Sequence, residues 1–360
     1  MDINKQITVS APGKIHFLGE HVVVYGKPAL LAAIDKRCTV SISQRKDKRI
    51  EIRSINLKNS ITVSGLAVLE GTKLAQKKWQ EFIKTGNVAL LLNLTKDPLS
   101  YPILAIGEAL LFYKKQLPSG FTLTIDSNIP MGAGLGSSAA LAVCIAAVLG
   151  KFLGEAEDKE KIYEIALRTE QKKHGRPSGG DPATVLHGGL LWFRKESDDL
   201  KIMEPVSFSI PETISRNFYL VDSGRPVEGT GEMIARVKLF HDQNKLKAHS
   251  IFDEQEHLTR EILTAIKLAD EKKIIKIIAL GQRNLEKLGV VSGFVKKLIR
   301  EIEKSGGAAK ISGGGGIKKG TGTLLVYHNN RKALEMILDS LQLHFFQTML
   351  GVEGLRIEKG

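Results

Sequence analysis

A glycine-rich segment near the middle of the chain constrains the fold more than any other feature. Residues Ile129 to Ala140 read IPMGAGLGSSAA, after a β-rich run and before an apolar helical pattern that ends near Phe152. Glycine reaches positive φ without a steric penalty, so this loop can turn sharply and expose successive backbone NH groups. Together with the unpaired NH groups and positive dipole end of the following helix, these donors predict a binding site for an anion such as a polyphosphate.

The loop differs from two common nucleotide-binding motifs. No lysine follows Gly136, which excludes a Walker A loop, and Ser137 stands where a dinucleotide-binding GxGxxG motif has its third glycine. Phosphate binding must therefore depend on backbone NH groups and hydroxyls, and Ser138 could reach a Mg²⁺ ion that bridges the phosphates. A tight turn whose serines only cap the helix is the structural alternative.

Size and composition indicate a folded protein of two domains. At 360 residues, 42% of them hydrophobic, the chain is long enough for two packed domains that share a cleft. The longest small-apolar run, Ala139 to Leu149, is too short to span a bilayer, and Met1 to Gln6 lacks the apolar stretch of a signal peptide. We therefore expect a cytoplasmic protein. Cys38 and Cys144 lie in apolar or alternating segments that are typical of buried thiols.

The charge balance favours anionic partners. The chain has 52 Lys+Arg against 39 Asp+Glu, a net charge of +13, which attracts nucleotides and nucleic acids alike. The basic residues are spread out, and only 6% of the chain is aromatic, so the platforms that base stacking requires are scarce. We expect a small-molecule partner, no membrane partner and no nucleic-acid groove.

Hydrophobic periodicity predicts a mixture of strands and helices. The predicted strands are Ile7 to Ser10, Cys38 to Ser43, Ile50 to Arg53, Phe121 to Asp126, Gly188 to Phe193, Phe218 to Asp222 and Thr323 to Tyr327. The predicted helices include Pro102 to Lys115, Ser138 to Phe152, Lys159 to Lys172 and Arg331 to Leu341. The polar stretch Pro211 to Asn217 is a candidate linker. We therefore expect an N-terminal domain over residues 1–210 and a C-terminal domain over residues 211–360.

Three segments resemble, in order along the chain, the motifs of the GHMP kinases. Ser10 to Ala29 (SAPGKIHFLGEHVVVYGKPA) resembles the first motif, and its GEHxVVxG form is most similar to that of the mevalonate kinases. Pro130 to Val143 (PMGAGLGSSAALAV) resembles the second, phosphate-binding motif, and Lys310 to Gly316 (KISGGGG) resembles the third. The resemblance implies a two-domain α+β fold, with an N-terminal domain like ribosomal protein S5 domain 2 and a ferredoxin-like C-terminal domain.

The same resemblance implies the reaction and its co-substrates. It implies ATP-dependent phosphorylation of the C5 hydroxyl of mevalonate, with Mg²⁺ as the metal and with ATP and substrate bound between the domains. The implied ATP-binding residues are Gly132, Ala133, Gly134, Leu135, Gly136, Ser137 and Ser138.

A fourth segment, Glu170 to Asp181 (EQKKHGRPSGGD), resembles the part of these kinases that carries the chemistry. The resemblance implies that Glu170 and Ser138 hold Mg²⁺. It also implies that Asp181 faces the substrate hydroxyl, as a base or as an electrostatic stabiliser, with Lys14 beside it. An opposite charge nearby favours the ionised form of such a carboxylate.

The resemblance also implies three substrate-binding residues. Glu20 and His21 belong to the first motif, and Thr230 resembles a threonine in the segment that enters the second domain. Capping of the following helix explains Thr230 equally well.

Two departures from the family pattern leave the substrate and the regulation open. The segment Pro182 to Gly189 lacks a polar Ser-Thr pair that mevalonate kinases usually have. The third motif lacks its usual alanine and continues as Ile317 to Gly322, so we expect a longer, more basic and more mobile loop there. The alternatives are another GHMP kinase that acts on a sugar or on phosphomevalonate, or a non-catalytic protein of this fold that binds ligand or nucleic acid. A homodimer is one option for the oligomeric state.

Overall fold

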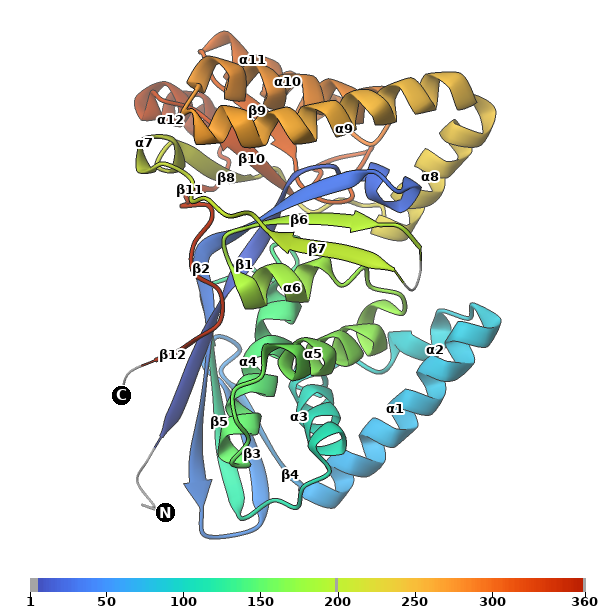
Figure 1. The fold of residues 1–360 in the computed structure, drawn as a ribbon, viewed down its shortest axis with the longest axis vertical. Helices are drawn as coiled ribbons and strands as arrows, with labels where there is room; N and C mark the ends of the chain where they lie inside the picture. The colour runs from blue at the N-terminus through green and yellow to red at the C-terminus, as the bar shows by residue number, and fades with distance from the viewer. Residues whose placement is uncertain (1–5, 198–199, 359–360) are drawn as a thin grey trace.

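The computed structural model describes residues 6–197 and 200–358 and places them in two α+β domains (Figure 1). An eight-stranded sheet forms the base of the first domain, and a four-stranded sheet forms the base of the second. The two-domain α+β fold that the sequence predicts is therefore confirmed. In the described part of the chain, no helix is long and apolar enough to cross a membrane.

Two long antiparallel strands, β1 (Ile7–Leu18) and β2 (Pro28–Arg45), run through the first sheet. The second half of β2 pairs with β5, and its first half pairs with β6, so this hairpin connects the two wings of the sheet. The other strands of the sheet are β3 (Arg49–Ser54), β4 (Asn59–Ser64), β5 (Gly120–Ser127), β6 (Leu190–Lys195), β7 (Lys201–Pro205) and β12 (Arg356–Ile357). The predicted strands at residues 7–10 and 38–43 are thus parts of longer ones.

The length of β1 has a physical explanation. The register between β1 and β2 shifts at Pro12 and Gly13, and β1 continues beyond this irregularity into the first glycine-containing motif. Proline and glycine usually weaken a strand, which is why the sequence pattern predicts an end near Ser10. The continuation matters because it carries Lys14 and His16 into the centre of the molecule.

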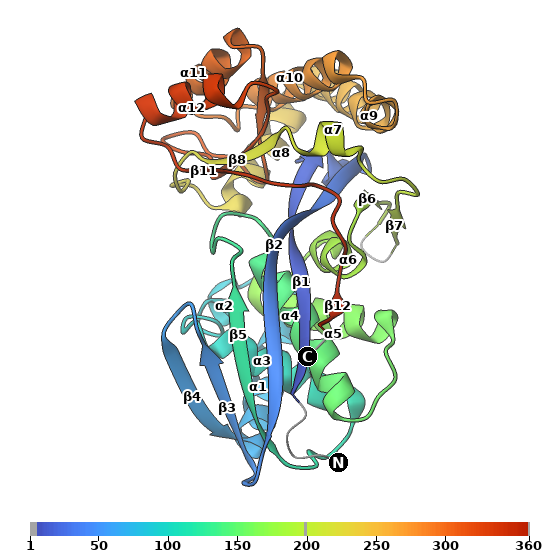
Figure 2. The same cartoon turned by 90° about the vertical axis from the view of Figure 1, so that its left-hand side faces the viewer.

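Helices cover one face of the first sheet (Figure 2). They are α1 (Gly65–Thr85), α2 (Ala89–Leu92), α3 (Ser100–Tyr113), α4 (Ser137–Phe152), α5 (Lys159–His174) and α6 (Gly180–His187). The short 3₁₀ helix η1 (Val22–Tyr25) lies instead at the connection between β1 and β2, next to β6. The predicted helices at α3, α4 and α5 are confirmed. Helix α1 was not predicted, because only Val68, Thr72 and Ala75 are buried in its 21 residues and its apolar periodicity is weak.

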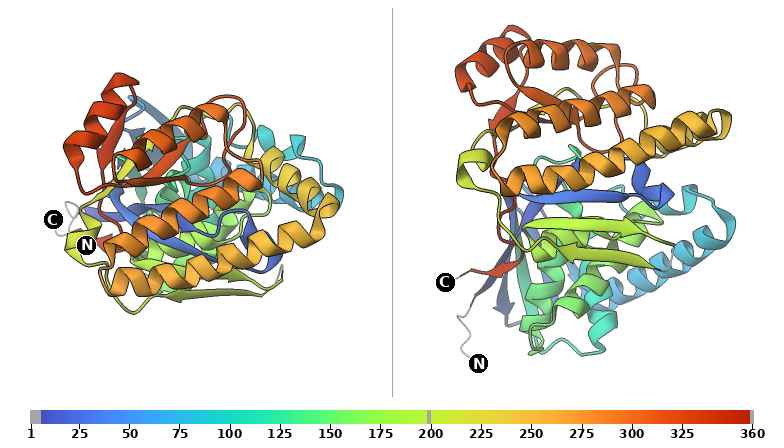
Figure 3. Two further views of the ribbon diagram at one scale, coloured as in Figure 1. Left: turned by 90° about the horizontal axis from the view of Figure 1, so that it is seen from above. Right: turned by 45° about the horizontal axis from the view of Figure 1, so that its top comes forward.

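The second domain has an antiparallel sheet in the order β11-β8-β10-β9 with helices packed over it (Figure 3). Its strands are β8 (Phe218–Asp222), β9 (Ala308–Ile311), β10 (Thr323–Tyr327) and β11 (Phe345–Gln347). Its helices are α7 (Glu212–Ser215), α8 (Thr230–Gln243), α9 (Lys245–Lys267), α10 (Glu271–Lys287), α11 (Gly293–Lys304) and α12 (Arg331–Ser340). The candidate linker contains α7, and Ile214 and Ser215 are buried there, so this stretch is packed rather than free.

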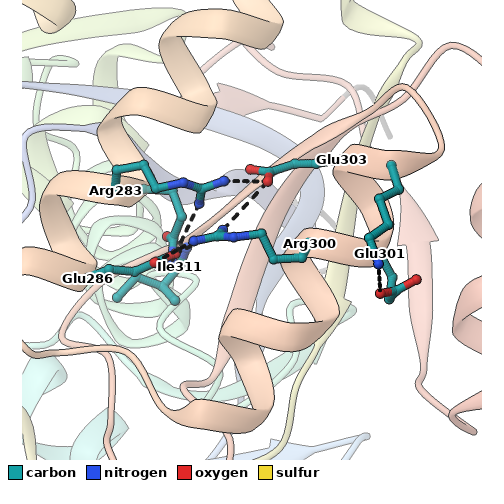
Figure 4. A network of polar contacts seen from close by, with 8 residues as sticks. Arg283, Glu286, Arg300, Glu301, Glu303 and Ile311 are labelled. Carbon is teal, nitrogen blue, oxygen red and sulfur yellow. Dashed lines mark hydrogen bonds and ion pairs between the residues drawn. The ribbon is translucent and has the colours of Figure 1, made fainter.

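Charged side chains join α10 to α11 in the second domain (Figure 4). Glu286 accepts hydrogen bonds from Arg283 at 3.0 Å and from Arg300 at 2.7 Å. Nearby, the side-chain oxygen of Gln282 accepts a hydrogen bond from the backbone NH of Ile311 at 3.0 Å. These contacts fix the position of β9, whose residue Lys310 reaches toward the first domain.

The chain returns to the first domain after β11. Strand β11 pairs with β8 in the second sheet, whereas β12 pairs with β1 in the first sheet. On the way, Arg37 donates hydrogen bonds to the backbone oxygens of Glu353 at 2.8 Å and Gly354 at 2.7 Å. This returning segment, residues 348–357, therefore completes the first domain, although the domain division drawn from the sequence assigns it to the second.

Candidate active site

A cavity of about 810 Å³ has walls from both domains. The first domain contributes β1, the glycine-rich loop, the start of α4, the end of α5 and the start of α6. The second domain contributes the start of α8 and parts of the loop between β9 and β10. Of the residues proposed from sequence, those on its wall are Lys14, Gly132, Ala133, Gly134, Leu135, Gly136, Ser137, Ser138, Glu170, Asp181 and Thr230.

The glycine-rich loop has the conformation that its composition predicts. Gly132, Gly134 and Gly136 have φ values of 75°, 75° and 72°, which side-chain-bearing residues rarely adopt. A Cβ atom on Gly136 would lie 2.7 Å from Cγ of Lys14, so only glycine allows this close approach. The backbone NH of Lys14 donates to the backbone oxygen of Leu135 at 2.9 Å. These contacts hold the phosphate-binding loop against β1.

Helix α4 begins directly after this loop, at Ser137. Its N-cap residue is Gly136, and no side chain makes a capping hydrogen bond there in the described structure. The alternative in which the serines only cap the helix is therefore not supported. The first NH groups of α4 remain available for an anion, as expected for a helix that starts at a cavity wall.

Lys14 and Asp181 meet at the cavity. Nζ of Lys14 lies 3.0 Å from Oδ1 of Asp181, and the carboxylate side chain is 34% exposed. Asp181 is in the first turn of α6, directly after the tight turn at Gly179, where φ is 90°. Burial is the largest single influence and raises the pKa of Asp181. The charge and hydrogen bond of Lys14, together with contributions from His16 and His174, outweigh it jointly, so the net pKa is below its ordinary value. The carboxylate is thus ionised and accessible.

His16 is a cavity residue that our sequence interpretation did not select. Its Nε2 lies 4.0 Å from Oδ1 of Asp181, and its Nδ1 is buried without a hydrogen-bond partner among the described residues. Burial, with a further contribution from the charge of Lys14, lowers the pKa of His16 to about 3, so the imidazole is neutral. The sequence does contain a signal for it, because residues two apart in a strand share a face and Lys14 is two positions earlier.

Glu170 and Ser138 lie near each other on the wall, connected by Tyr101. The Tyr101 hydroxyl donates a short hydrogen bond to Oε1 of Glu170 and lies 3.2 Å from the backbone oxygen of Ser138. Burial, and then the charge of Glu170, raises the pKa of Tyr101 well above its usual range, which keeps the phenol protonated as a donor. Tyr101 was not proposed from sequence, because it lies far from every motif.

The surroundings of Glu170 fit a divalent cation. Its side chain is 4% exposed, and Oε2 lies 3.6 Å from Nε2 of His174. Among the residues that the structure describes, no lysine or arginine pairs with this carboxylate, although a buried carboxylate normally requires a cationic partner. The described residues contain no group of three or more His, Cys, Asp or Glu side chains that could hold a metal. Any ion here would need phosphate and water oxygens as further ligands, which is the preference of Mg²⁺.

Glu20 and His21 are placed at the domain interface rather than on the cavity wall. Glu20 is 2% exposed and forms a short ion pair with the fully buried Lys310 of β9. Nε2 of His21 lies 3.0 Å from the backbone oxygen of Gly314, and burial, followed by the charge of Lys310, lowers the pKa of His21 to about 4. The structure therefore does not bring these two residues together with Lys14 and Asp181, and their contact with substrate stays a prediction.

The second domain reaches the cavity through Thr230 and the third glycine motif. The N-cap of α8 is Gly229, so Thr230 is free of the capping role that the sequence left open. The hydroxyl of Ser312 accepts a hydrogen bond from the backbone NH of His16 at 3.2 Å. The hydroxyl of Thr323 donates to the backbone oxygen of Ala133 at 2.8 Å, which joins the start of β10 to the glycine-rich loop of the first domain. The mobility expected for residues 317–322 stays a prediction.

A glycine-rich loop at the start of a helix, beside a lysine–aspartate pair, is the arrangement that the GHMP kinase motifs imply. Two family models match parts of the chain. The model for the GHMP kinases N terminal domain matches residues 104–189, and the galactokinase galactose-binding signature matches residues 2–44. Among curated proteins, the mevalonate kinase of Archaeoglobus fulgidus is 32% identical over 308 residues, covering 85% of this chain and 88% of that protein. The mevalonate kinase of Schizosaccharomyces pombe is 28% identical, covering 99% of this chain and 92% of that protein. The chain therefore belongs to the mevalonate kinase family, as its motifs predict.

Solved structures give the same fold. A crystal structure of mevalonate kinase superposes with a TM-score of 0.76 at 21% identity, covering 96% of this chain and 99% of that one. The mevalonate kinase of L. major in complex with R-mevalonate has a TM-score of 0.72 at 18% identity, covering 96% of each chain. Lactococcus lactis galactokinase complexed with galactose has a TM-score of 0.70 at 18% identity, covering 99% of this chain and 96% of that one. These similarities establish the fold, and they do not separate the substrates.

Proposed function

We propose that this protein transfers the γ-phosphoryl group of ATP to the C5 hydroxyl of mevalonate, yielding 5-phosphomevalonate for isoprenoid precursor synthesis in the cytoplasm. Its family relatives support the substrate. The observation that carries the chemistry is the 3.0 Å contact between Lys14 and Asp181, in the same cavity as the glycine-rich loop. We also expect a homodimer, and light scattering would measure the molar mass of the protein in solution.

Phosphoryl transfer depends on in-line positioning and charge neutralisation more than on covalent chemistry. Residues Gly132 to Ser138 are suited to bind the phosphates of ATP through backbone NH groups at the positive end of α4. Glu170 and Ser138 are the residues that would hold Mg²⁺. When bound, this ion would supply positive charge that stabilises the phosphates of ATP during transfer.

Asp181 is the proposed group at the reacting hydroxyl. Its carboxylate is ionised and open to the cavity, so it can accept the hydroxyl proton or stabilise it as the oxygen attacks. Lys14 favours the ionised carboxylate and offers a positive charge to the developing alkoxide. His16, neutral and within 4.0 Å of the same carboxylate, borders the space in which the acceptor alcohol would lie.

A substrate panel tests this function. ADP release would be measured with ATP and mevalonate, phosphomevalonate or galactose as the acceptor, with Asp181→Asn as the inactive control. Galactose belongs in the panel because residues 2–44 match a galactokinase signature. We expect turnover with mevalonate. No ADP release with mevalonate, together with turnover of galactose, would assign a sugar kinase. No ADP release with any of the three acceptors, together with DNA binding that weakens as salt rises, would indicate a non-catalytic binding protein.

A further inference from the structure

We propose that Tyr101 is a positioning residue that orients the Glu170 carboxylate for binding of the metal–nucleotide complex. The inference rests on the proposed function, in which Glu170 and Ser138 hold the metal. It concerns a residue outside the four motif segments, brought to them by the start of α3.

The Tyr101 hydroxyl touches both of these residues. It donates to Oε1 of Glu170 and lies 3.2 Å from the backbone oxygen of Ser138. A phenol has one proton, so it can donate fully to only one acceptor, and a carboxylate is a stronger acceptor than a peptide oxygen. The contact therefore fixes one oxygen of Glu170 and places that carboxylate relative to the first turn of α4.

The tyrosine ring is itself held firmly. Tyr101 is 6% exposed, and Nζ of Lys173 lies 5.0 Å from the ring centroid in a cation–π contact. The carboxylate that it contacts has no lysine or arginine partner in the described structure and is 4% exposed. Each carboxylate oxygen has more than one acceptor site, so a hydrogen bond from Tyr101 leaves Glu170 able to bind a cation as well.

Loss of this hydroxyl should therefore weaken the metal complex rather than the binding of nucleotide alone. Partners that orient a metal ligand typically change metal affinity about 10- to 100-fold when they are removed. Tyr101→Phe deletes one oxygen and keeps the ring and its cation–π contact. We expect it to weaken binding of Mn²⁺–ATP by about 10- to 100-fold and to leave binding of ATP without metal nearly unchanged.

The experiment measures Mn²⁺ and ATP binding by the full-length protein without an acceptor, with free Mn²⁺ followed by electron paramagnetic resonance. The matched control is Tyr327→Phe, because the Tyr327 hydroxyl donates to Glu271 at 2.8 Å in the second domain, outside the cavity wall. We expect this control to bind Mn²⁺–ATP as the unaltered protein does. Equal affinities in Tyr101→Phe and in the control would overturn the role of Tyr101.

Two further outcomes are informative. If Tyr101→Phe does not fold, tyrosines labelled with ¹³C at Cζ in the unaltered protein provide the second measurement. Addition of Mg²⁺ to the ATP-bound protein must then shift a tyrosine Cζ resonance that ATP alone does not shift, and the absence of such a shift would overturn the inference. If the unaltered protein binds no metal–nucleotide complex at all, the proposed function fails together with this inference, whereas the preceding results count against Tyr101 alone.

Discussion

The first motif contributes one partner to each of two lysine–carboxylate pairs, and their surroundings differ sharply. Lys14 pairs with Asp181 at 3.0 Å, and that carboxylate is 34% exposed at the cavity. Glu20 pairs with Lys310 where both side chains are sealed between the domains, at 2% and 0% exposure. The same pair of charges is thus available to a substrate in one place and inaccessible in the other. The two pairs therefore differ in solvent access rather than in residue type.

The buried Glu20–Lys310 pair is stabilised by further hydrogen bonds. Lys310 donates to the backbone oxygens of Ile311 at 2.7 Å and His16 at 3.4 Å in addition to Glu20. Burial lowers the pKa of Lys310, and the Glu20 charge opposes this effect without cancelling it. Buried ion pairs often contribute little net stability, but removal of one partner leaves an uncompensated charge. The two pairs should therefore respond differently to the same kind of substitution.

The largest effect is expected on turnover, from substitution of Asp181 in the accessible Lys14–Asp181 pair. Asp181→Asn removes the carboxylate proposed to accept or stabilise the hydroxyl proton while it preserves side-chain size, so kcat should fall by about 10²- to 10⁴-fold. Nucleotide affinity should be nearly unchanged, because Asp181 is not among the residues that would bind phosphate. Steady-state kinetics and ATP titration measure the two effects. Near-normal turnover would remove Asp181 from the chemistry.

Substitution of the buried Glu20–Lys310 pair is expected to change the free energy of unfolding. Lys310→Met leaves Glu20 buried without its cation, and removal of one partner of such a pair costs about 3–5 kcal/mol. Urea unfolding of Lys310→Met, Glu20→Gln and the double variant would measure it. The double variant should lose much less than the sum of the single losses, because neither charge remains. Additive losses would show that the two side chains do not act as a pair.

The smallest effect concerns the two neutral histidines beside these pairs. Burial lowers the pKa of His16 to about 3 and of His21 to about 4, whereas the unfolded chain protonates histidine near pH 6.5. Stability from these groups is complete above about pH 6.5 and is lost as the pH falls toward those lower values, by roughly 1 kcal/mol per histidine near pH 5.5.

Unfolding measured between about pH 5.5 and 7.5 tests this linkage. His16→Gln and His21→Gln should each flatten the pH dependence of unfolding free energy. The matched control is His257→Gln, because the His257 side chain is 69% exposed and its removal should leave the slope unchanged. Identical slopes in all three variants would mean that the buried histidines are not neutral in the folded protein.

Local features of the fold were predictable from sequence because their signals are local. The glycine-rich loop and α4 follow from three glycines, two hydroxyl residues and an apolar helical pattern within one short segment. The contact between Lys14 and Asp181 was expected only through the family resemblance, because periodicity says nothing about which distant residues meet. The family assignment and the two-domain α+β fold are both confirmed.

Other features needed the structure. Glu20 was interpreted as a substrate-binding residue, but its partner Lys310 lies 290 positions away and no sequence spacing indicates their pairing. Tyr101 is one residue in an apolar helix, where a core role is the default expectation. His16 did carry a usable signal, its strand spacing from Lys14, which became clear only once β1 was seen to continue past Pro12 and Gly13.

The returning segment has a consequence for how this protein is made. Because β12 supplies the outer neighbour of β1, a sheet that begins near residue 7 is finished only after residues 356 and 357 have been synthesised. During translation, the outer edge of β1 would present unpaired backbone groups that can pair with other chains. Proteolytic removal of the returning segment, residues 348–357, should likewise expose the edge of β1 and make the protein prone to aggregation, although every proposed catalytic residue would still be present.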